Sequence, residues 1–242
     1  MDERPGDIQQ LSDGGYGASG VTPAQLAWGV PAQPQSYWPA RIAVVAAAVL
    51  YVLLPERLIP GPRLLVPVLE GVVLLVISVV FPHRTSHEPS TVRRVMAIVL
   101  IALVTVANLI NLGLLIRELL KGGIQNGREL VFSSIAIWVT NVIVFGLWYW
   151  ELDRGGPAAR HDPAHREPDF FFPQMTTPGA ARPGWTPTFV DYLYVSLTNA
   201  TAFSPTDTMP LTPTAKALMG VQALASLLTV ALVAARAVNI LS

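Results

Sequence analysis

The sequence predicts an all-α membrane protein with about five transmembrane helices, and with a short re-entrant helix and irregular loop before the last helix. First, hydrophobic residues make up 52% of the 242 residues and charged residues only 13%, about half of the ~25% that is usual in soluble domains. Second, the apolar residues form blocks of roughly 20 residues, the length that crosses ~30 Å of hydrocarbon. Third, a helix-forming segment too short to cross precedes the last block.

Charge and cysteine content exclude several classes of function. Lys and Arg (16) balance Asp and Glu (16), so no basic excess indicates nucleic acid as a partner. The chain has no cysteine, which excludes disulfides, thiolate metal sites, iron–sulfur clusters and cysteine nucleophiles. The four histidines are His83, His87, His161 and His165. They lie in two loops without a nucleophile motif, Walker loop or dinucleotide fingerprint, so we expect no enzyme, no metal and no cofactor.

The apolar blocks divide the chain into four regions. Residues 1–36 are polar and are expected to be a disordered tail. Residues 37–151 hold four predicted transmembrane helices: Tyr37–Leu54, Leu64–Phe81, Val95–Leu115 and Leu130–Trp150. Residues 152–187 are expected to be a solvated extramembrane loop, because prolines and glycines interrupt any helix there. Residues 188–242 contain the short segment and the last predicted transmembrane helix, Ala215–Ile240.

A short helix is predicted from Thr188 to Thr201. Thr186 or Thr188 can cap its first turn, Pro187 is tolerated there, and Asp191 complements the helix dipole. Its length, about 21 Å, is too small to cross the hydrocarbon. A polar, non-helical stretch from residue 202 to 210 then leads directly into the last block, which favours a re-entrant segment over a helix lying on the surface. Irregular backbone at membrane depth must be buried in protein or line a water-filled cavity.

The order of residues in this region is characteristic. The short helix carries Tyr192, Tyr194, Ser196, Thr198 and Thr201, then come Asp207, Pro210, Leu211 and Thr212, and Gly220 lies in the last block. In this order residues 188–240 resemble the pore module of tetrameric pore-loop cation channels. The resemblance implies a pore-type helix, a filter-like segment and an inner helix with a hinge glycine. It implies an ion pathway that includes Thr198, Asn199, Thr201, Phe203, Ser204, Thr206 and Asp207.

The filter-like segment departs from the potassium-channel pattern. A potassium filter needs glycines so that successive carbonyl groups can turn toward the ion. Residues 202–206 contain no glycine, and Pro205 has a fixed backbone angle and no amide donor. We therefore do not expect potassium selectivity from a carbonyl ladder.

The C-terminal half also resembles a family of uncharacterised bacterial integral membrane proteins of unknown function. The resemblance rests on Asp191-Tyr-Leu-Tyr, on residues 198–203, and on Thr206-Asp207. It implies a multi-pass protein of the bacterial inner (cell) membrane and no particular activity.

Polar residues within the apolar blocks are candidate functional groups. Glu70 lies inside the second block, where a carboxylate costs ~2.5–3.5 kcal/mol to insert. It is either a functional site or a protonated or paired glutamate that fixes helix packing. Gln222, Ser226 and Thr229 lie on one stripe of the last block, which faces either a water-filled pathway or, as we favour, a helix–helix seam. Asn108, Asn111 and Asn141 are expected to hold helices together.

These patterns lead to three hypotheses for function. The first is a pore-loop ion channel-like protein with a non-potassium filter, which acts as a homo-oligomer in the lipid bilayer and as a tetramer if it forms a pore. The second is a non-conducting membrane protein with a structural or partner-binding role. The third is a small proton-coupled transporter that uses Glu70.

Overall fold

The computed structural model describes residues 35–80, 90–122, 126–161, 167–175, 177, 185–202 and 207–241. Its helices are α1 (Trp38–Leu53), α2 (Leu65–Val80), α3 (Thr91–Leu120), α4 (Gly127–Leu152), α5 (Phe189–Ala202) and α6 (Pro213–Leu241). Short 3-10 turns cover Glu56–Leu58, Asp153–Gly155, Ala159–His161 and Pro173–Met175. The strands β1 (Phe170–Phe171) and β2 (Met209–Pro210) pair antiparallel, with Phe170 opposite Pro210. The described residues are mostly helical, which fits the predicted all-α fold, and they also include one two-stranded ribbon.

Three helices are long and apolar enough to cross a membrane. These stretches are Thr91–Leu120, Gly127–Gly155 and Pro213–Ala234. The helices α1 and α2 are apolar but have 16 residues each, which is about 24 Å of helix and shorter than the hydrocarbon core. The described chain is therefore compatible with a membrane protein, and it contains three helices long enough to span a membrane beside two shorter apolar helices.

Local capping explains where the helices begin. The side chain of Ser90 accepts a hydrogen bond from the Arg93 amide at the start of α3, and Asn126 accepts one from the Arg128 amide at the start of α4. At α5, the backbone amide and hydroxyl of Thr188 both donate to Asp191, at 2.7 and 2.8 Å. These contacts satisfy or orient groups that have no partner within the first helical turn.

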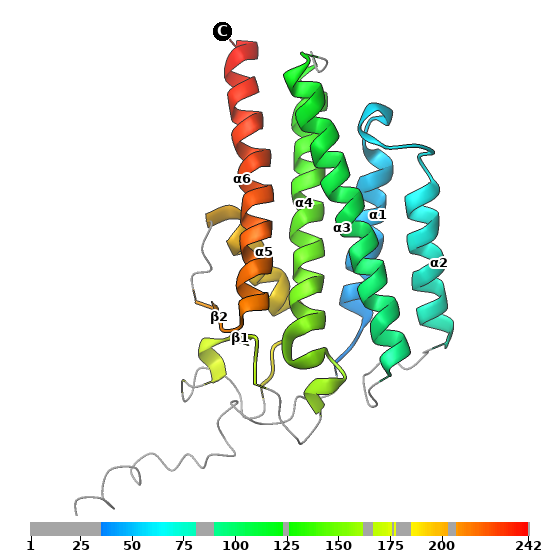
Figure 1. Ribbon diagram of the computed structural model, residues 1–242, viewed down its shortest axis with the longest axis vertical. Helices are drawn as coiled ribbons and strands as arrows, with labels where there is room; N and C mark the ends of the chain where they lie inside the picture. Colours follow the sequence, from blue (N-terminus) through cyan, green and yellow to red (C-terminus); the bar gives the residue numbers. More distant parts are fainter. Residues whose placement is uncertain are drawn as a thin grey trace, which may run out of the picture.

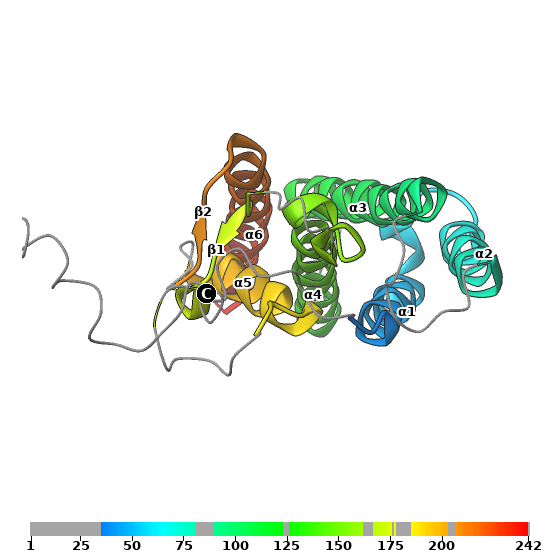
Figure 2. The same cartoon turned by 90° about the horizontal axis from the view of Figure 1, so that it is seen from below.

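The central element of the bundle is α4. It packs against α1 and α3 on one side and against α5 and α6 on the other, while α2 covers the outer side of α1 and α3 (Figures 1 and 2). The buried core follows α4, and its largest fully buried side chains include Tyr149, Phe145 and Leu130. Because α4 is covered from both sides, even its polar residues such as Ser133 and Asn141 are buried.

The chain from residue 188 to 210 enters and leaves the bundle at the same end. The ring of Phe189 contacts Trp150 near the end of α4, with centroids 5.8 Å apart. Further along α5, the Ser196 hydroxyl donates to the Val142 carbonyl at 2.6 Å, two turns deeper along α4. By Met209 the chain is back at the first end, where β2 pairs with β1 (Figure 1). Residues 203–206, between these points, are outside the described residues.

Close contact between α4 and α5 depends on Gly146. A Cβ atom at this position would lie 3.1 Å from the Cα of Leu193 and 3.2 Å from its side chain. Only glycine therefore lets the two backbones approach this closely without a shift of α5.

The described parts of the segment from 152 to 187 differ from the solvated loop that its composition predicts. Asp153, Arg154, Arg160, Phe170 and Met175 are all buried against the end of the bundle. Proline and glycine prevent a regular helix, as expected, but they do not prevent burial when side-chain hydrogen bonds satisfy the backbone.

Candidate functional site

The filter-like residues do not share one environment. Thr198 is half-buried and Thr201 exposed, and each hydroxyl donates back to a carbonyl of its own helix, to Val195 at 3.0 Å and to Leu197 at 2.9 Å. Asp207 is exposed. Asn199, by contrast, is buried and turned toward α6, where its amide donates to the Met219 carbonyl at 3.0 Å. The predicted pathway residues Phe203, Ser204 and Thr206 are outside the described residues.

A buried hydrogen-bond network joins α4, α5 and α6 around Gln222, whose side chain is fully buried. Its amide nitrogen donates to the Ser196 carbonyl at 2.9 Å and to the Ser196 hydroxyl at 2.7 Å. Its amide oxygen accepts from the Tyr149 hydroxyl at 2.5 Å and from the Asn199 amide at 2.8 Å. Each of the three helices thus contributes at least one polar group, and both ends of the Gln222 amide are satisfied.

The rest of the polar stripe on α6 also faces a neighbouring helix or its own backbone. The Asn141 amide donates to the Ser226 hydroxyl at 2.9 Å, and the Thr229 hydroxyl donates to the Ala225 carbonyl at 2.8 Å. All three side chains are buried. The Asn141–Ser226 hydrogen bond joins α4 to α6, as in a helix–helix seam, whereas the Thr229 hydroxyl bonds within α6.

Glu70 lies in a separate internal site among α1, α2, α3 and α4. It is 2% exposed and borders a cavity of about 10 Å³ with Tyr51, Asn108, Asn111 and Thr140. This volume suffices for about one water molecule. Within the described residues, one Glu70 carboxylate oxygen and the Tyr51 hydroxyl have no hydrogen-bond partner. The small cavity can hold a water molecule, and Glu70 also lines the larger groove of about 360 Å³ between α1 and α2.

The Asn111 amide closes one side of this cavity. With its nitrogen directed at the backbone, it donates to the Leu58 carbonyl at 2.9 Å and to the Ala107 carbonyl at 3.2 Å. Asn111 thereby ties the turn after α1 to α3, which is the packing role that the sequence predicts.

A second polar cluster, centred on Asp153, lies at the end of α4. One Asp153 oxygen accepts from the backbone amides of Asp169 and Phe170, at 2.7 and 3.3 Å. The other accepts from the Tyr192 hydroxyl of α5 and lies 3.8 Å from the Arg160 guanidinium. Burial raises the pKa of the Tyr192 phenol well above its ordinary value, so the hydroxyl remains a donor.

The Asp153 cluster fixes the segment before α5 and the start of α6. The Arg160 guanidinium donates to Gln35 at 3.1 Å, and the Asp169 carboxylate accepts from the Thr212 hydroxyl at 2.7 Å. Arg154 has a left-handed backbone (φ 54°), which lets its amide donate to Asp169 at 3.1 Å. Sequence reasoning missed this cluster. The one sequence feature that could have indicated it is the apolar run Phe170–Phe172 inside a polar segment, which suggests burial.

Metal binding finds no support in the described residues, where no three His, Asp or Glu side chains form a group that could hold an ion. The side chain of His161 is not described, and His83, His87 and His165 are outside the described residues. The geometry leaves residues 188–210 and the Glu70 cavity as the candidate functional features. Protein-family models, curated proteins and solved structures give no match to this chain.

Proposed function

We propose that the protein is an oligomeric, pore-loop ion channel-like membrane protein with a filter segment that is not of the potassium type. The observation that carries the proposal is the path of residues 188–210, which enter the bundle as α5 and return to the same end before α6 begins. Pore-forming re-entrant segments take this path. In this proposal the carboxyl end of α5, the negative end of its dipole, favours a cation at membrane depth.

The filled interior of the chain supports a pathway between subunits rather than inside one. Gln222, Ser196 and Asn199 use their polar groups to join α5 to α6, so in the described residues these groups are engaged inside the chain and do not line an ion route. The outward side of α5, in contrast, presents Tyr194 and Thr201. One re-entrant segment cannot enclose a pore, so the proposal requires several copies around an axis, four by analogy with the channels.

Asp207 is the residue with the clearest expected effect on conduction. It is exposed at the end of the bundle where the re-entrant segment returns, so copies of it would form a negative ring at the pore mouth. We expect Asp207→Asn to lower cation conductance several-fold at low ionic strength and less at high salt, because salt screens the ring. The measurement is the current through planar bilayers that contain the purified full chain.

A matched control is Glu118→Gln, which removes one carboxylate from the far end of α3 and should leave the current unchanged. Currents that Asp207→Asn does not alter, or well-folded wild-type protein that carries no current, would contradict the proposal. Crosslinking followed by mass measurement gives an independent test. A tetramer is expected, whereas a protein that is only monomeric would indicate a non-conducting structural or partner-binding role.

A second candidate function, proton-coupled transport, rests on the Glu70 cavity. The buried carboxylate has one oxygen without a partner in the described residues and faces the Tyr51 hydroxyl across a water-sized space. Intramembrane carboxylates in such sites carry protons in pumps and transporters. If Glu70 couples transport to protons, Glu70→Gln abolishes proton flux into reconstituted vesicles under a pH gradient while the protein elutes as a folded species. Equal flux in both proteins would exclude this candidate.

A further inference from the structure

Three adjoining cavities run from one end of the bundle toward its middle. The first, about 440 Å³, is lined by residues at the start of α3 and by the turn that follows α4. The second, about 70 Å³, lies among α1, α2, α3 and α4 and shares Arg93 and Glu151 with the first. The third, about 360 Å³, follows the groove between α1 and α2 and shares Val44 and Leu74 with the second.

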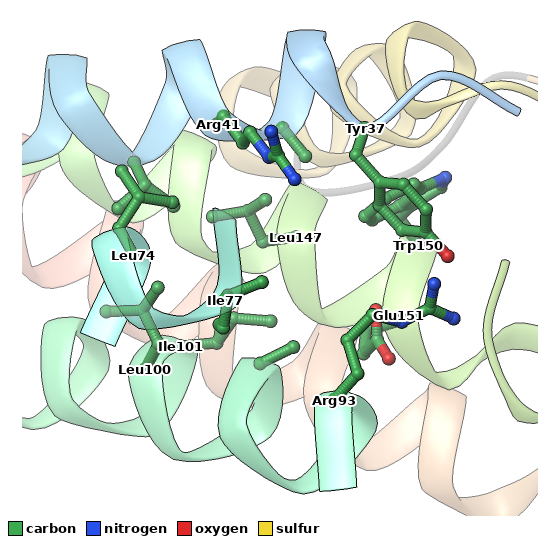
Figure 3. Close-up of a pocket in the computed structure, with 13 residues that line it drawn as sticks. Tyr37, Arg41, Leu74, Ile77, Arg93, Leu100, Ile101, Leu147, Trp150 and Glu151 are labelled. Atoms are coloured by element: carbon green, nitrogen blue, oxygen red, sulfur yellow. The ribbon is translucent and has the colours of Figure 1, made fainter. Parts of the chain in front are cut away.

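Polarity changes along this series. Polar side chains lining the first cavity are Ser90, Thr91, Arg93, Arg94 and Glu151. In the second, Leu74, Leu100 and Ile101 lie at one end, and Tyr37, Trp150, Glu151 and Arg93 at the other (Figure 3). The third is lined by apolar residues, among them Val45, Ala48, Val49, Val52 and Leu53, and by one carboxylate, Glu70, on the α2 side. The series therefore has the polarity of an amphiphile, with a polar head at one end and an apolar chain at the other.

Positive charge predominates at the polar end. Arg93 and Arg94 line the first cavity, and Arg41 lines the second. Among the described residues, Glu151 is the one acidic residue that lines either cavity; it is 5% exposed and interacts electrostatically with Arg93, Arg94 and Arg160. The Arg93 guanidinium lies over the Tyr37 ring, 4.7 Å from its centroid, which fixes its position. A monoanionic group such as a phosphodiester complements this end.

The polar end also lies at the level of the interfacial aromatic residues. Tyr37 and Trp38 precede or begin α1, Trp150 lies near the end of α4, and the Tyr37 and Trp150 rings pack edge to face, 5.5 Å apart. Such rings prefer the headgroup region of a bilayer. From Arg41 to Leu53 α1 then rises about 18 Å, close to the ~15 Å thickness of one hydrocarbon leaflet.

We propose that these cavities bind one anionic phospholipid. Its phosphate lies beside Arg93 and Arg94, its glycerol region beside Arg41 and Tyr37, and one acyl chain in the groove between α1 and α2. Charge complementarity selects the anionic headgroup, and the mainly apolar groove between α1 and α2 selects a lipid over a free phosphate. The inference does not depend on whether the protein conducts ions.

Lipid retention by the detergent-purified full chain tests the headgroup site. Native mass spectrometry would compare phosphatidylglycerol with phosphatidylcholine of the same acyl chains, and preferential retention of phosphatidylglycerol is expected. Arg93→Gln and Arg94→Gln should each weaken its retention about fivefold, because each removes one cation near the phosphate. Arg117→Gln, at the opposite end of α3, is the matched control and should have no effect.

A second pair of variants tests the acyl-chain groove. Ala48→Phe fills the groove between α1 and α2 and should reduce phosphatidylglycerol retention although every arginine is present. Ile42→Phe, on the 63% exposed face of the same helix, should not. Should Arg93→Gln fail to fold, Arg93→Lys keeps the charge and is expected to keep preferential retention.

Three outcomes would overturn the proposal. Equal retention of the two lipids would remove the headgroup preference. An effect of Arg117→Gln as large as that of Arg93→Gln would indicate general surface electrostatics. Displacement of bound lipid by soluble glycerol phosphate at equal concentration would identify the feature as a free phosphate site, and not as a lipid site.

Discussion

Gln222→Leu tests the hydrogen-bond network that holds α5 in the bundle. Leucine has nearly the same size but can neither accept from Tyr149 and Asn199 nor donate to Ser196, so four hydrogen bonds are lost. The Tyr149 hydroxyl becomes a buried donor without a partner, which costs ~1–3 kcal/mol. Loss of the other three bonds, at ~0.6 kcal/mol each within a membrane protein, brings the expected destabilisation to about 3–5 kcal/mol.

The assay is equilibrium unfolding of the purified chain in mixed detergents, compared with wild type. Tyr149→Phe provides the second arm of a double-mutant cycle, because it removes the donor that Gln222→Leu leaves without a partner. In the Tyr149→Phe background, Gln222→Leu should cost at least 1 kcal/mol less. Leu224→Ala, at a 63% exposed position on α6, serves as the control and should change stability by less than ~0.5 kcal/mol. The network would be refuted as a stabilising element if Gln222→Leu lowered the free energy of unfolding by less than ~1 kcal/mol. It would also be refuted if the effects of Gln222→Leu and Tyr149→Phe were strictly additive.

Three further substitutions probe other parts of the fold. Gly146→Val places a branched side chain where even a Cβ atom would lie 3.1 Å from the Leu193 Cα, so α5 must shift. The thermal unfolding temperature of the purified chain should fall by at least several degrees. Asp153→Asn leaves the buried Arg160 without its ion-pair partner. In detergent unfolding, the free energy of unfolding should fall by about 3–5 kcal/mol. An unchanged unfolding midpoint would show that the pair is dispensable. Glu70→Gln removes a buried carboxylate that has one oxygen without a partner in the described residues. The free energy of unfolding should therefore stay equal or rise. A decrease of more than ~2 kcal/mol would instead identify a structural ion pair or hydrogen bond.

The helical segments were the most predictable part of the fold. The predicted blocks 95–115 and 130–150 fall within α3 and α4, and the short helix predicted over 188–201 is α5, Phe189–Ala202. These agreements follow from physical signals in the sequence: apolar length sets a span, and capping residues such as Thr188 and Asp191 set a helix start. The same signals made α1 and α2 look like full spans, although the described helix has 16 residues in each case.

Long-range polar contacts were not predictable. Nothing in the sequence indicates that Asn199, in the short helix α5, turns inward to Gln222, since its neighbours Thr198 and Thr201 have similar polarity but are half-buried and exposed. The Asp153 cluster was missed for a related reason. Its residues come from a segment whose prolines and glycines predict a loop, and composition does not reveal whether a loop is buried. The stripe of Gln222 and Ser226 could be located from helical periodicity, but only the contacts identify it as a seam.

The central claim is that residues 188–210 enter and leave the membrane on the same side, and labelling of single cysteines tests it most directly. The chain has no native cysteine, so Thr188→Cys, Asp207→Cys and Lys121→Cys each introduce one thiol without background. In sealed vesicles of uniform orientation, a membrane-impermeant maleimide should label Thr188→Cys and Asp207→Cys from one face and Lys121→Cys from the other. Labelling of Thr188→Cys and Asp207→Cys from opposite faces would mean that the segment crosses the membrane, and the proposed pore-loop function would be wrong.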